Sequence, residues 1–441
     1  MADLNLKSID IRNYRCFEEL HIEFGKKLTL FVGKNGAGKT SILDAVAVAI
    51  STFLCGIQDG KSRNISKEDA RYEFYEMAGM TDAQHQFPVV IDAVGECNGK
   101  QDISWSRALN SVNGKTTIKD AHNLISIAED MQKQVMEGNQ EIILPVLSYY
   151  GTGRLYAQKK ERRDIQKLQK FNRQVGYIDC MAAESNEKLM LNWFEKMTLK
   201  SLQNQQKTGK AEKIPQLAVV EEAVCESFRK ISNCRKADLS FDLDTHRIII
   251  IYEDHSGKEY RFAMNELSDG YKNTLSMIAD IAYRMVVLNP QLGEETLQNT
   301  PGIILIDEVD LHLHPEWQQS ILTDLQEIFP RVQFLVTSHA PAVINSVSRE
   351  NVRILEWGKI YVPAEQTYGR DANSILREVM QVEERPKVVQ QKLLEFYDAI
   401  DKENIAEAEK TLNEIEKLIG DNDPEVNAAK VKLDLKKMWE E

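Results

Sequence analysis

The sequence predicts an α/β fold with a mixed sheet, built around a phosphate-binding loop. An apolar run of β type, Leu28 to Val32, leads into the spacing Gly-x4-Gly-Lys-Thr that ends at Thr40. A second run, Gly302 to Ile306, is short and uniformly apolar, as expected of a strand buried in the centre of a sheet. It ends in two acids, Asp307 and Glu308. Strands that end in such groups predict a nucleotide site at one edge of the sheet.

The glycine-rich segment that ends at Thr40 predicts the phosphate contacts. Glycines let successive backbone N–H groups point at phosphate oxygens, and a helix beginning near Lys39 adds its positive N-terminal end. The Lys39 ammonium can reach the β and γ phosphates, and the Thr40 hydroxyl can ligate the Mg²⁺ that accompanies ATP. A glycine-rich turn without a ligand is the alternative. The residues expected to bind ATP are Asn35, Gly36, Ala37, Gly38, Lys39, Thr40 and Ser41.

The acids after the second apolar run predict metal binding and hydrolysis. Two adjacent carboxylates at the end of a buried strand are costly unless they meet a cation. We therefore expect Asp307 to hold Mg²⁺ through water, which makes Thr40 and Asp307 the metal residues. Glu308 is expected to polarise the attacking water. A strand that merely ends in solvent-facing acids is the alternative.

The segment Leu267-Ser268-Asp269-Gly270 precedes a helical apolar pattern, about 35 residues ahead of the acidic strand. It resembles the signature motif of ABC-type ATPases, a group that includes RecF, Rad50 and SMC proteins. The resemblance implies that Ser268 and Gly270 present donors to a γ-phosphate bound on a second subunit, so that ATP joins two heads. An ordinary helix N-cap is the alternative.

Two further segments fit an ABC-type head. The run Val332 to His339 predicts a second buried strand that ends in a histidine. In ABC-type ATPases the histidine at this place contacts the γ-phosphate, and a neutral imidazole can donate one hydrogen bond there. A core histidine at a strand end is the alternative. The run Ile9 to Phe17 resembles the opening strand of RecF and Rad50 heads, where a basic residue near Arg15 lies by the nucleotide.

One position departs from that pattern. ABC and Rad50 heads usually carry an Asp six positions after the catalytic Glu, and His314 stands there in this chain. The local form Glu-x-x-x-His-Leu-His-Pro resembles stand-alone defence ATPases and overcoming-lysogenization-defect ATPases, in which this loop lies across the dimer interface. Metal binding by the His-x-His pair is the alternative, although such a site needs further ligands nearby.

Composition and charge limit the kind of protein that this chain can be. The net charge of −13 argues against a protein that coats nucleic acid over its whole surface. The basic segment Arg154 to Arg173 is the candidate for sequence-independent contact with a DNA backbone, with a solvated helix face as the alternative. The N-terminus lacks a charged-then-apolar signal region, and the long apolar run after the phosphate loop contains Asp44. We expect a cytoplasmic protein without a membrane segment.

The motifs divide the chain into four expected parts. They are the first part of the ATPase head (1–153), a helical insertion (154–235), the second part of the head with signature, acids and histidine (236–363), and a helical tail for partner binding (364–441). Within them we expect a strand at Ile142 to Tyr150, a hairpin turn at Asp254 to Gly257, and tail helices near 387–401, 403–419 and 424–439.

The spacing of the motifs excludes some relatives. Thr40 and Leu267 lie 227 positions apart without a sustained heptad repeat, which excludes the long tether of SMC and Rad50 proteins. The nucleases among the overcoming-lysogenization-defect proteins need a Glu and an Asp-x-Asp on strands after the ATPase, and the last 100 residues predict too few strands. We expect that the chain does not cut DNA unaided.

Motifs over most of the chain resemble the ATPase subunit of Septu-type anti-phage systems, PtuA, including retron-associated forms. They are Leu144 to Arg154, Leu267 to Tyr271, His312 to Pro315, Thr337 to Pro341, Tyr368 to Leu376 and Glu384 to Pro386. The resemblance implies a separately encoded HNH nuclease as partner and, in retron versions, a reverse transcriptase with its RNA–DNA product.

These expectations give a functional hypothesis. Two or more heads bind ATP and Mg²⁺ between them, and the nucleotide state controls how the helical parts hold a nuclease. One alternative is a scaffold that binds ATP without hydrolysing it, for a nuclease or a retron complex. The other is a DNA-repair ATPase of RecF type, which would bind duplex DNA alone with a steep salt dependence.

Overall fold

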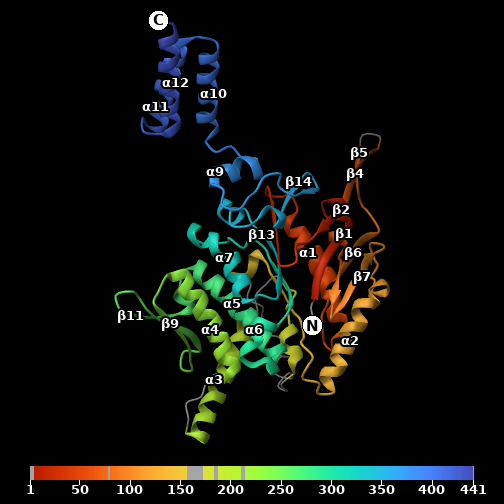
Figure 1. Ribbon diagram of the computed structural model, residues 1–441. Helices are drawn as coiled ribbons and strands as arrows, with labels where there is room; N and C mark the ends of the chain where they lie inside the picture. The colour runs from red at the N-terminus through yellow and green to blue at the C-terminus, as the bar shows by residue number, and fades with distance from the viewer. Residues whose placement is uncertain (1–3, 78–79, 156–171, 183–186, 210–213, 441) are drawn as a thin grey trace. The chain divides into compact units, whose positions relative to one another are not determined.

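The computed structural model describes residues 4–77, 80–155, 172–182, 187–209 and 214–440 (Figure 1). The chain forms two compact units, Met1–Arg370 and Asp371–Glu441. The first holds every predicted nucleotide-binding residue, and the second is helical.

A six-stranded sheet forms the centre of the first unit. Its strand order is β15 (Lys359–Tyr361), β14 (Val352–Glu356), β3 (Leu28–Gly33), β13 (Val332–Thr337), β12 (Gly302–Ile306) and β8 (Val146–Tyr150). All of these strands are parallel except β15, which pairs antiparallel with β14. The four strands from β3 to β8 are buried over almost their whole length, which explains their uniformly apolar sequences. Their carboxyl ends meet at one edge of the sheet.

A second sheet lies on the other side of helix α1 (Lys39–Ile50). It is antiparallel, with the order β2 (Phe17–Glu23), β1 (Leu4–Tyr14), β6 (Val89–Cys97) and β7 (Lys100–Leu109). Helix α1 contacts β1 and β6 of this sheet and β12 and β13 of the other. Among the described residues, Lys39–Gly56 alone has the length and apolar character of a membrane span, and 83% of it is buried inside the unit. The phosphate-loop helix is therefore the core helix of the unit.

The first unit also contains further helices and two small antiparallel sheets. The helices are α2 (His122–Met136), α3 (Glu187–Thr208), α4 (Pro215–Ser232), α5 (Asp269–Leu288), α6 (Thr296–Asn299), α7 (Pro315–Ile328) and α8 (Pro341–Ile344). A three-stranded antiparallel sheet contains β9 (Lys236–Asp242), β10 (Arg247–Glu253) and β11 (Glu259–Ala263), and a two-stranded ribbon contains β4 (Tyr72–Met77) and β5 (Met80–His85).

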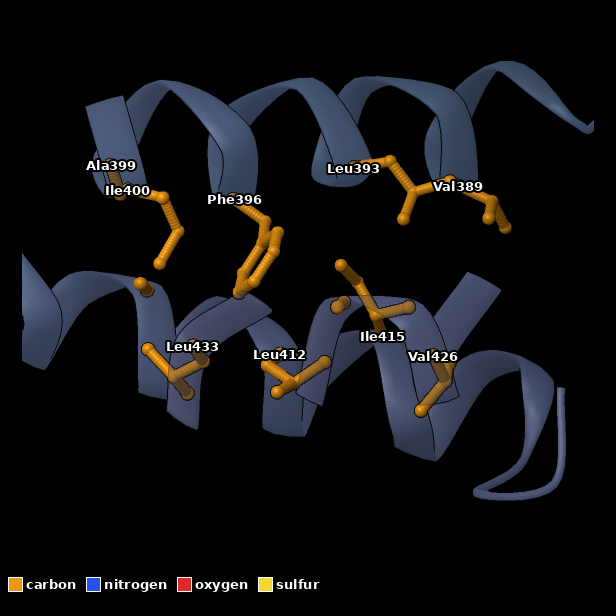
Figure 2. Packing of buried hydrophobic residues seen from close by; sticks show 11 residues of the cluster. Val389, Leu393, Phe396, Ala399, Ile400, Leu412, Ile415, Val426 and Leu433 are labelled. Carbon is orange, nitrogen blue, oxygen red and sulfur yellow. The ribbon is translucent and has the colours of Figure 1, made fainter. Parts of the chain in front are cut away.

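The second unit is a small helical body with its own core. After the short α9 (Ala372–Ser374) come α10 (Lys387–Asp401), α11 (Ile405–Ile419) and α12 (Pro424–Glu440). Side chains of the three long helices meet in one apolar cluster that includes Phe396, Leu412 and Leu433 (Figure 2). Gly420 ends α11 with a φ of 88°, a value that favours glycine. Arg385, ahead of α10, pairs with Asp423, ahead of α12, through two bonds of 3.0 and 2.9 Å.

The predicted class, α/β with a mixed sheet and a helical C-terminal tail, is confirmed. The expected tail helices and the hairpin turn between β10 and β11 are present. One strand was predicted too long, because β8 begins at Val146 and not at Ile142. Pro145 has no N–H group to donate, and the backbone of Leu144 is hydrogen-bonded by the Asn289 side chain at 2.8 Å. The boundaries between the four expected parts stay a prediction.

Candidate functional site

The predicted phosphate loop joins the end of β3 to the start of α1. Gly38 is the N-cap of α1, with a φ of 103°, and Gly36 has a φ of 80°. A Cβ atom at residue 38 would lie 2.6 Å from the Cys16 sulfur and 2.6 Å from the Phe17 ring. Only glycine fits there, because both the backbone angle and the space exclude a side chain. The first amides of α1 are thereby left at the rim of the loop, where they can bind an anion.

Lys39 is held inside this loop. Its side chain is buried, and Nζ donates hydrogen bonds to the carbonyl oxygens of Gly33 at 2.9 Å and Lys34 at 3.1 Å. Burial lowers the pKa of Lys39, and the carboxylates of Asp307, Glu308 and Asp310 oppose that change. The ammonium group is therefore a pre-positioned positive charge close to the acids that follow β12.

A chain of short hydrogen bonds joins the ends of α1, β12 and β13. The Thr40 hydroxyl donates to Asp307 Oδ2 at 2.8 Å, and the Thr337 hydroxyl donates to Asp307 Oδ1 at 2.6 Å. The Thr337 hydroxyl also accepts the backbone N–H of Glu308 at 2.8 Å. Asp307 is only 2% exposed, and its own N–H donates to the carbonyl of Tyr150 on β8. The Asp307 carboxylate therefore links α1 and β13 to β12 at the edge of the sheet where the parallel strands end.

The segment after β12 turns sharply around these acids. Glu308 and His312 have φ values of 49° and 63°, in the left-handed region that non-glycine residues seldom adopt. Burial lowers the pKa of His339, and the positive charge of Lys39 lowers it further. The neutral imidazole is thus favoured. His339 lies beyond β13, which ends at Thr337, so the expectation of a histidine at the last position of the strand was wrong by two residues.

The side chains present at this edge fit a magnesium nucleotide. The Thr40 hydroxyl and the Asp307 carboxylate are oxygen ligands of the kind that Mg²⁺ prefers, and they are already 2.8 Å apart. Within the described residues, the buried Oδ1 atom of Asp310 has no hydrogen-bond partner, which is costly unless a cation or water completes it. The glycine cradle and the buried Lys39 complement phosphate charge.

The predicted signature segment packs against the loop that follows Asp307 and Glu308. Ser268 is the N-cap of α5, although within the described part of the chain its side chain makes no capping hydrogen bond. A Cβ atom at Gly270 would lie 2.4 Å from the carbonyl oxygen of His312. The rings of Tyr271 and Trp317 pack edge to face at 4.4 Å. The signature segment and the His312 loop therefore form one packed surface.

Arg15 reaches α1 from the turn between β1 and β2. Its guanidinium pairs with Asp44 at 2.5 Å and with Asp69 at 2.9 Å, and Arg63 pairs with the other oxygen of Asp44 at 2.8 Å. Burial alone would lower the pKa of Arg15, but Tyr14 and these carboxylates raise it overall. Asp44 lies one helical turn after Thr40, so the charged cluster is anchored beside the phosphate loop.

Three candidate functional residues were not predicted from the sequence. Thr337, Asp310 and Asp44 were assigned no role from the sequence, although Thr337 and Asp310 stand inside motifs noted there. Their positions could have indicated a role: Thr337 ends a buried strand, Asp310 follows one, and Asp44 lies one turn into the phosphate-loop helix. His312 and His314 gain no metal partner, since the described residues contain no group of three His, Cys, Asp or Glu side chains placed to hold an ion.

The basic segment predicted to contact DNA falls mostly outside the described residues. Its last member, Arg173, is described, and its guanidinium donates to the carbonyl oxygens of Leu288 at 2.5 Å and Ile142 at 2.6 Å. Burial lowers the pKa of Arg173. This residue belongs to the packing of the unit, and the prediction of DNA contact now rests on the rest of Arg154 to Arg173.

Comparisons with known proteins agree with the motifs. The AAA domain family matches residues 8–222. The chain is 24% identical to the retron Vc95 probable ATPase of Vibrio cholerae serotype O1 biovar El Tor, covering 93% of this chain and 86% of that protein. It is 26% identical to the retron Ec83 probable ATPase of Escherichia coli, with coverages of 87% and 78%. It is 24% identical to the Septu protein PtuA of Bacillus thuringiensis, with coverages of 91% and 90%.

Among the solved structures that match is an Smc head domain derived from Pyrococcus furiosus, bound to the C-terminal domain of ScpA. That match has 16% identity, covers 85% of this chain and 99% of the other, and has a TM-score of 0.44. The resemblance inferred from the motifs is confirmed by the sequence relatives: the chain is a homologue of proteins named as retron ATPases and as Septu PtuA.

Proposed function

We propose that this chain is the ATP-binding and ATP-hydrolysing switch subunit of an anti-phage defence complex, and that it controls a separately encoded HNH nuclease. The observation that carries the nucleotide part is the 2.8 Å bond between Thr40 and Asp307, with the buried Lys39 ammonium beside them. The names of the retron and Septu relatives support the defence role. A cytoplasmic location follows from that role and stays part of the proposal.

The chemistry follows from the positions of the side chains. Bound Mg²⁺ would supply positive charge and orientation to the phosphates, and Thr40 and Asp307 are the residues that would hold it. Lys39 and the α1 amides neutralise phosphate charge without reorganisation, because the loop already fixes them. Glu308 lies next to Asp307 on the same buried edge and orients the attacking water as general base. His339, kept neutral by burial, donates a hydrogen bond to the γ-phosphate.

The proposal includes two copies of the chain. Ser268 and Gly270, supported by the His312 loop, would face the phosphate loop of a second copy, which gives a homodimer of heads or a higher oligomer. The helical insertion and the tail would then hold the nuclease in a way that depends on the nucleotide. A retron reverse transcriptase and its RNA–DNA product are the further partners that the relatives suggest.

The deciding experiment combines two variants with the wild-type chain. Lys39→Met should abolish ATP binding, because it removes the charge inside the loop. Glu308→Gln should bind ATP but lose turnover, and it should accumulate as an ATP-linked dimer in sedimentation. Glu129→Gln, at an exposed residue of α2, is the matched control and should behave as wild type.

Nuclease control is measured in cells that carry the complete operon under phage challenge. Loss of protection in Glu308→Gln supports a hydrolytic switch. Full protection in that variant would favour a scaffold that binds ATP without hydrolysing it. Tight binding of duplex DNA by the wild-type chain alone, with a steep salt dependence, would favour a repair ATPase instead.

A further inference from the structure

We propose that Trp357 stacks on the purine base of the bound nucleotide, an inference that rests on the proposed ATP site. Trp357 is 90% exposed. It lies in the turn between β14 and β15, beyond the same edge of the sheet that carries the phosphate loop. An indole ring this exposed has a free face on which an aromatic ligand can stack.

The turn places Trp357 close to the phosphate loop. Leu355 pairs with Gly33 in the parallel ladder of β14 and β3. A Cβ atom on Gly33 would lie 2.5 Å from the Leu355 carbonyl oxygen, so the two backbones are in contact at that point. Trp357 follows Leu355 by two residues, and the reach of the chain limits the separation of their Cα atoms to about 7 Å. The turn that carries Trp357 therefore lies beside the first residues of the loop.

The expected position of the γ-phosphate indicates on which side of β3 the base lies. Asp307, Glu308 and His339 mark the end of the site for the γ-phosphate, and all three follow β12 or β13. Those strands lie on one side of β3, whereas β14 and β15 lie on the other side. In our proposal, the base of a nucleotide with its γ-phosphate at these acids lies on the opposite side of β3, where the β14–β15 turn is.

The backbone of the turn gives an independent reason. Glu356 pairs with Lys359, so Trp357 and Gly358 alone form the turn, with φ values of 50° and 73°. Asparagine or glycine is favoured at the first of these positions, because a bulky side chain strains a left-handed backbone. A tryptophan that is both strained and exposed contributes nothing to the fold that asparagine would not supply better. The fold therefore gives no reason for a tryptophan at this position, whereas a contact with the base of the nucleotide does.

The test uses the full-length chain and two ligands. Trp357→Asn removes the ring and supplies the residue that the turn prefers, so it should fold at least as well as wild type. ATP affinity should fall about tenfold, the loss of one base–aromatic stack, whereas affinity for tripolyphosphate should not change. Trp357→Tyr should retain most of the ATP affinity. Phe74→Ala, at an aromatic residue 71% exposed on β4, is the control and should bind both ligands normally.

Other outcomes overturn the inference in distinct ways. Unchanged ATP affinity in Trp357→Asn would refute stacking. An equal loss of affinity for ATP and for tripolyphosphate would indicate that Trp357 maintains the conformation of the phosphate loop. A change in dimerisation alone, measured by sedimentation with ATP, would assign it to contact with a second copy. Failure of the wild-type chain to bind either ligand would refute the proposed function itself, and this inference with it.

Discussion

Replacing Thr337 by Val is the sharpest test of how the catalytic edge is held together. The Thr337 hydroxyl donates to the Asp307 carboxylate at 2.6 Å and accepts the Glu308 N–H at 2.8 Å. Valine has nearly the same shape but can form neither bond. The change therefore removes two contacts at the site without opening a cavity.

The size of the effect follows from those two bonds. A hydrogen bond to a charged group contributes about 1.5–3 kcal/mol, and a buried N–H left without an acceptor costs about 1–3 kcal/mol. We expect a loss of about 3 kcal/mol in the free energy of unfolding. For a unit as large as Met1–Arg370, the unfolding entropy per residue makes this a fall of about 4 °C in Tm. ATP turnover should fall about tenfold or more, because Glu308 loses the anchor of its strained backbone.

Scanning calorimetry and steady-state phosphate release measure the two effects on the same preparations. Thr337→Ser is the matched control, since it keeps the hydroxyl and loses only a buried methyl group. It should lose about 1 kcal/mol of stability and keep nearly normal turnover. The reasoning is refuted if Thr337→Val turns over ATP at the wild-type rate, or if Thr337→Ser loses as much activity as the valine variant.

Three further predictions concern the tail and the β14–β15 turn. Phe396→Ala should cost about 3–5 kcal/mol, because Phe396 is fully buried among the three long tail helices. Hydrogen exchange over residues 387–440 should rise, whereas Leu394→Ala, at a residue 62% exposed, should leave it unchanged. A hydrogen bond from Arg385 lowers the pKa of Asp423, so this pair stabilises the tail above the unfolded pKa of about 3.9 and less as pH falls below it. Arg385→Gln should flatten that dependence in thermal unfolding followed by circular dichroism between pH 6 and 3; an unchanged slope would contradict the assignment. Trp357→Asn should raise stability by up to about 1 kcal/mol in calorimetry, because asparagine tolerates a left-handed backbone better, and a lower Tm would show that the indole supports the fold.

Short-range patterns predicted the core of the site. The phosphate loop, the acidic strand and α1 depend on residues close in sequence, so spacing and apolar runs were sufficient to find them. The three long tail helices were predicted to within two residues, because Gly420 and Pro424 mark the end of one helix and the start of the next.

The features that the sequence did not predict depend on contacts between residues far apart in the chain. The start of β8 depends on Asn289, far along the chain, which takes over the backbone groups of Leu144. The role of Thr337 depends on β13 lying beside β12, a neighbourhood that spacing does not reveal. The same holds for Asp44, whose two arginine partners come from the β1–β2 turn and from the loop after α1.

Gly302 has no functional group, yet it governs the distance between two strands. A Cβ atom at this residue would lie 2.0 Å from the carbonyl oxygen of Val146 on β8. Even an alanine would push β12 outward, and Asp307 and Glu308 at the far end of that short strand would move with it. A saturation library at this codon should therefore return glycine alone, and alignments of active homologues should be as invariant here as at the acids themselves.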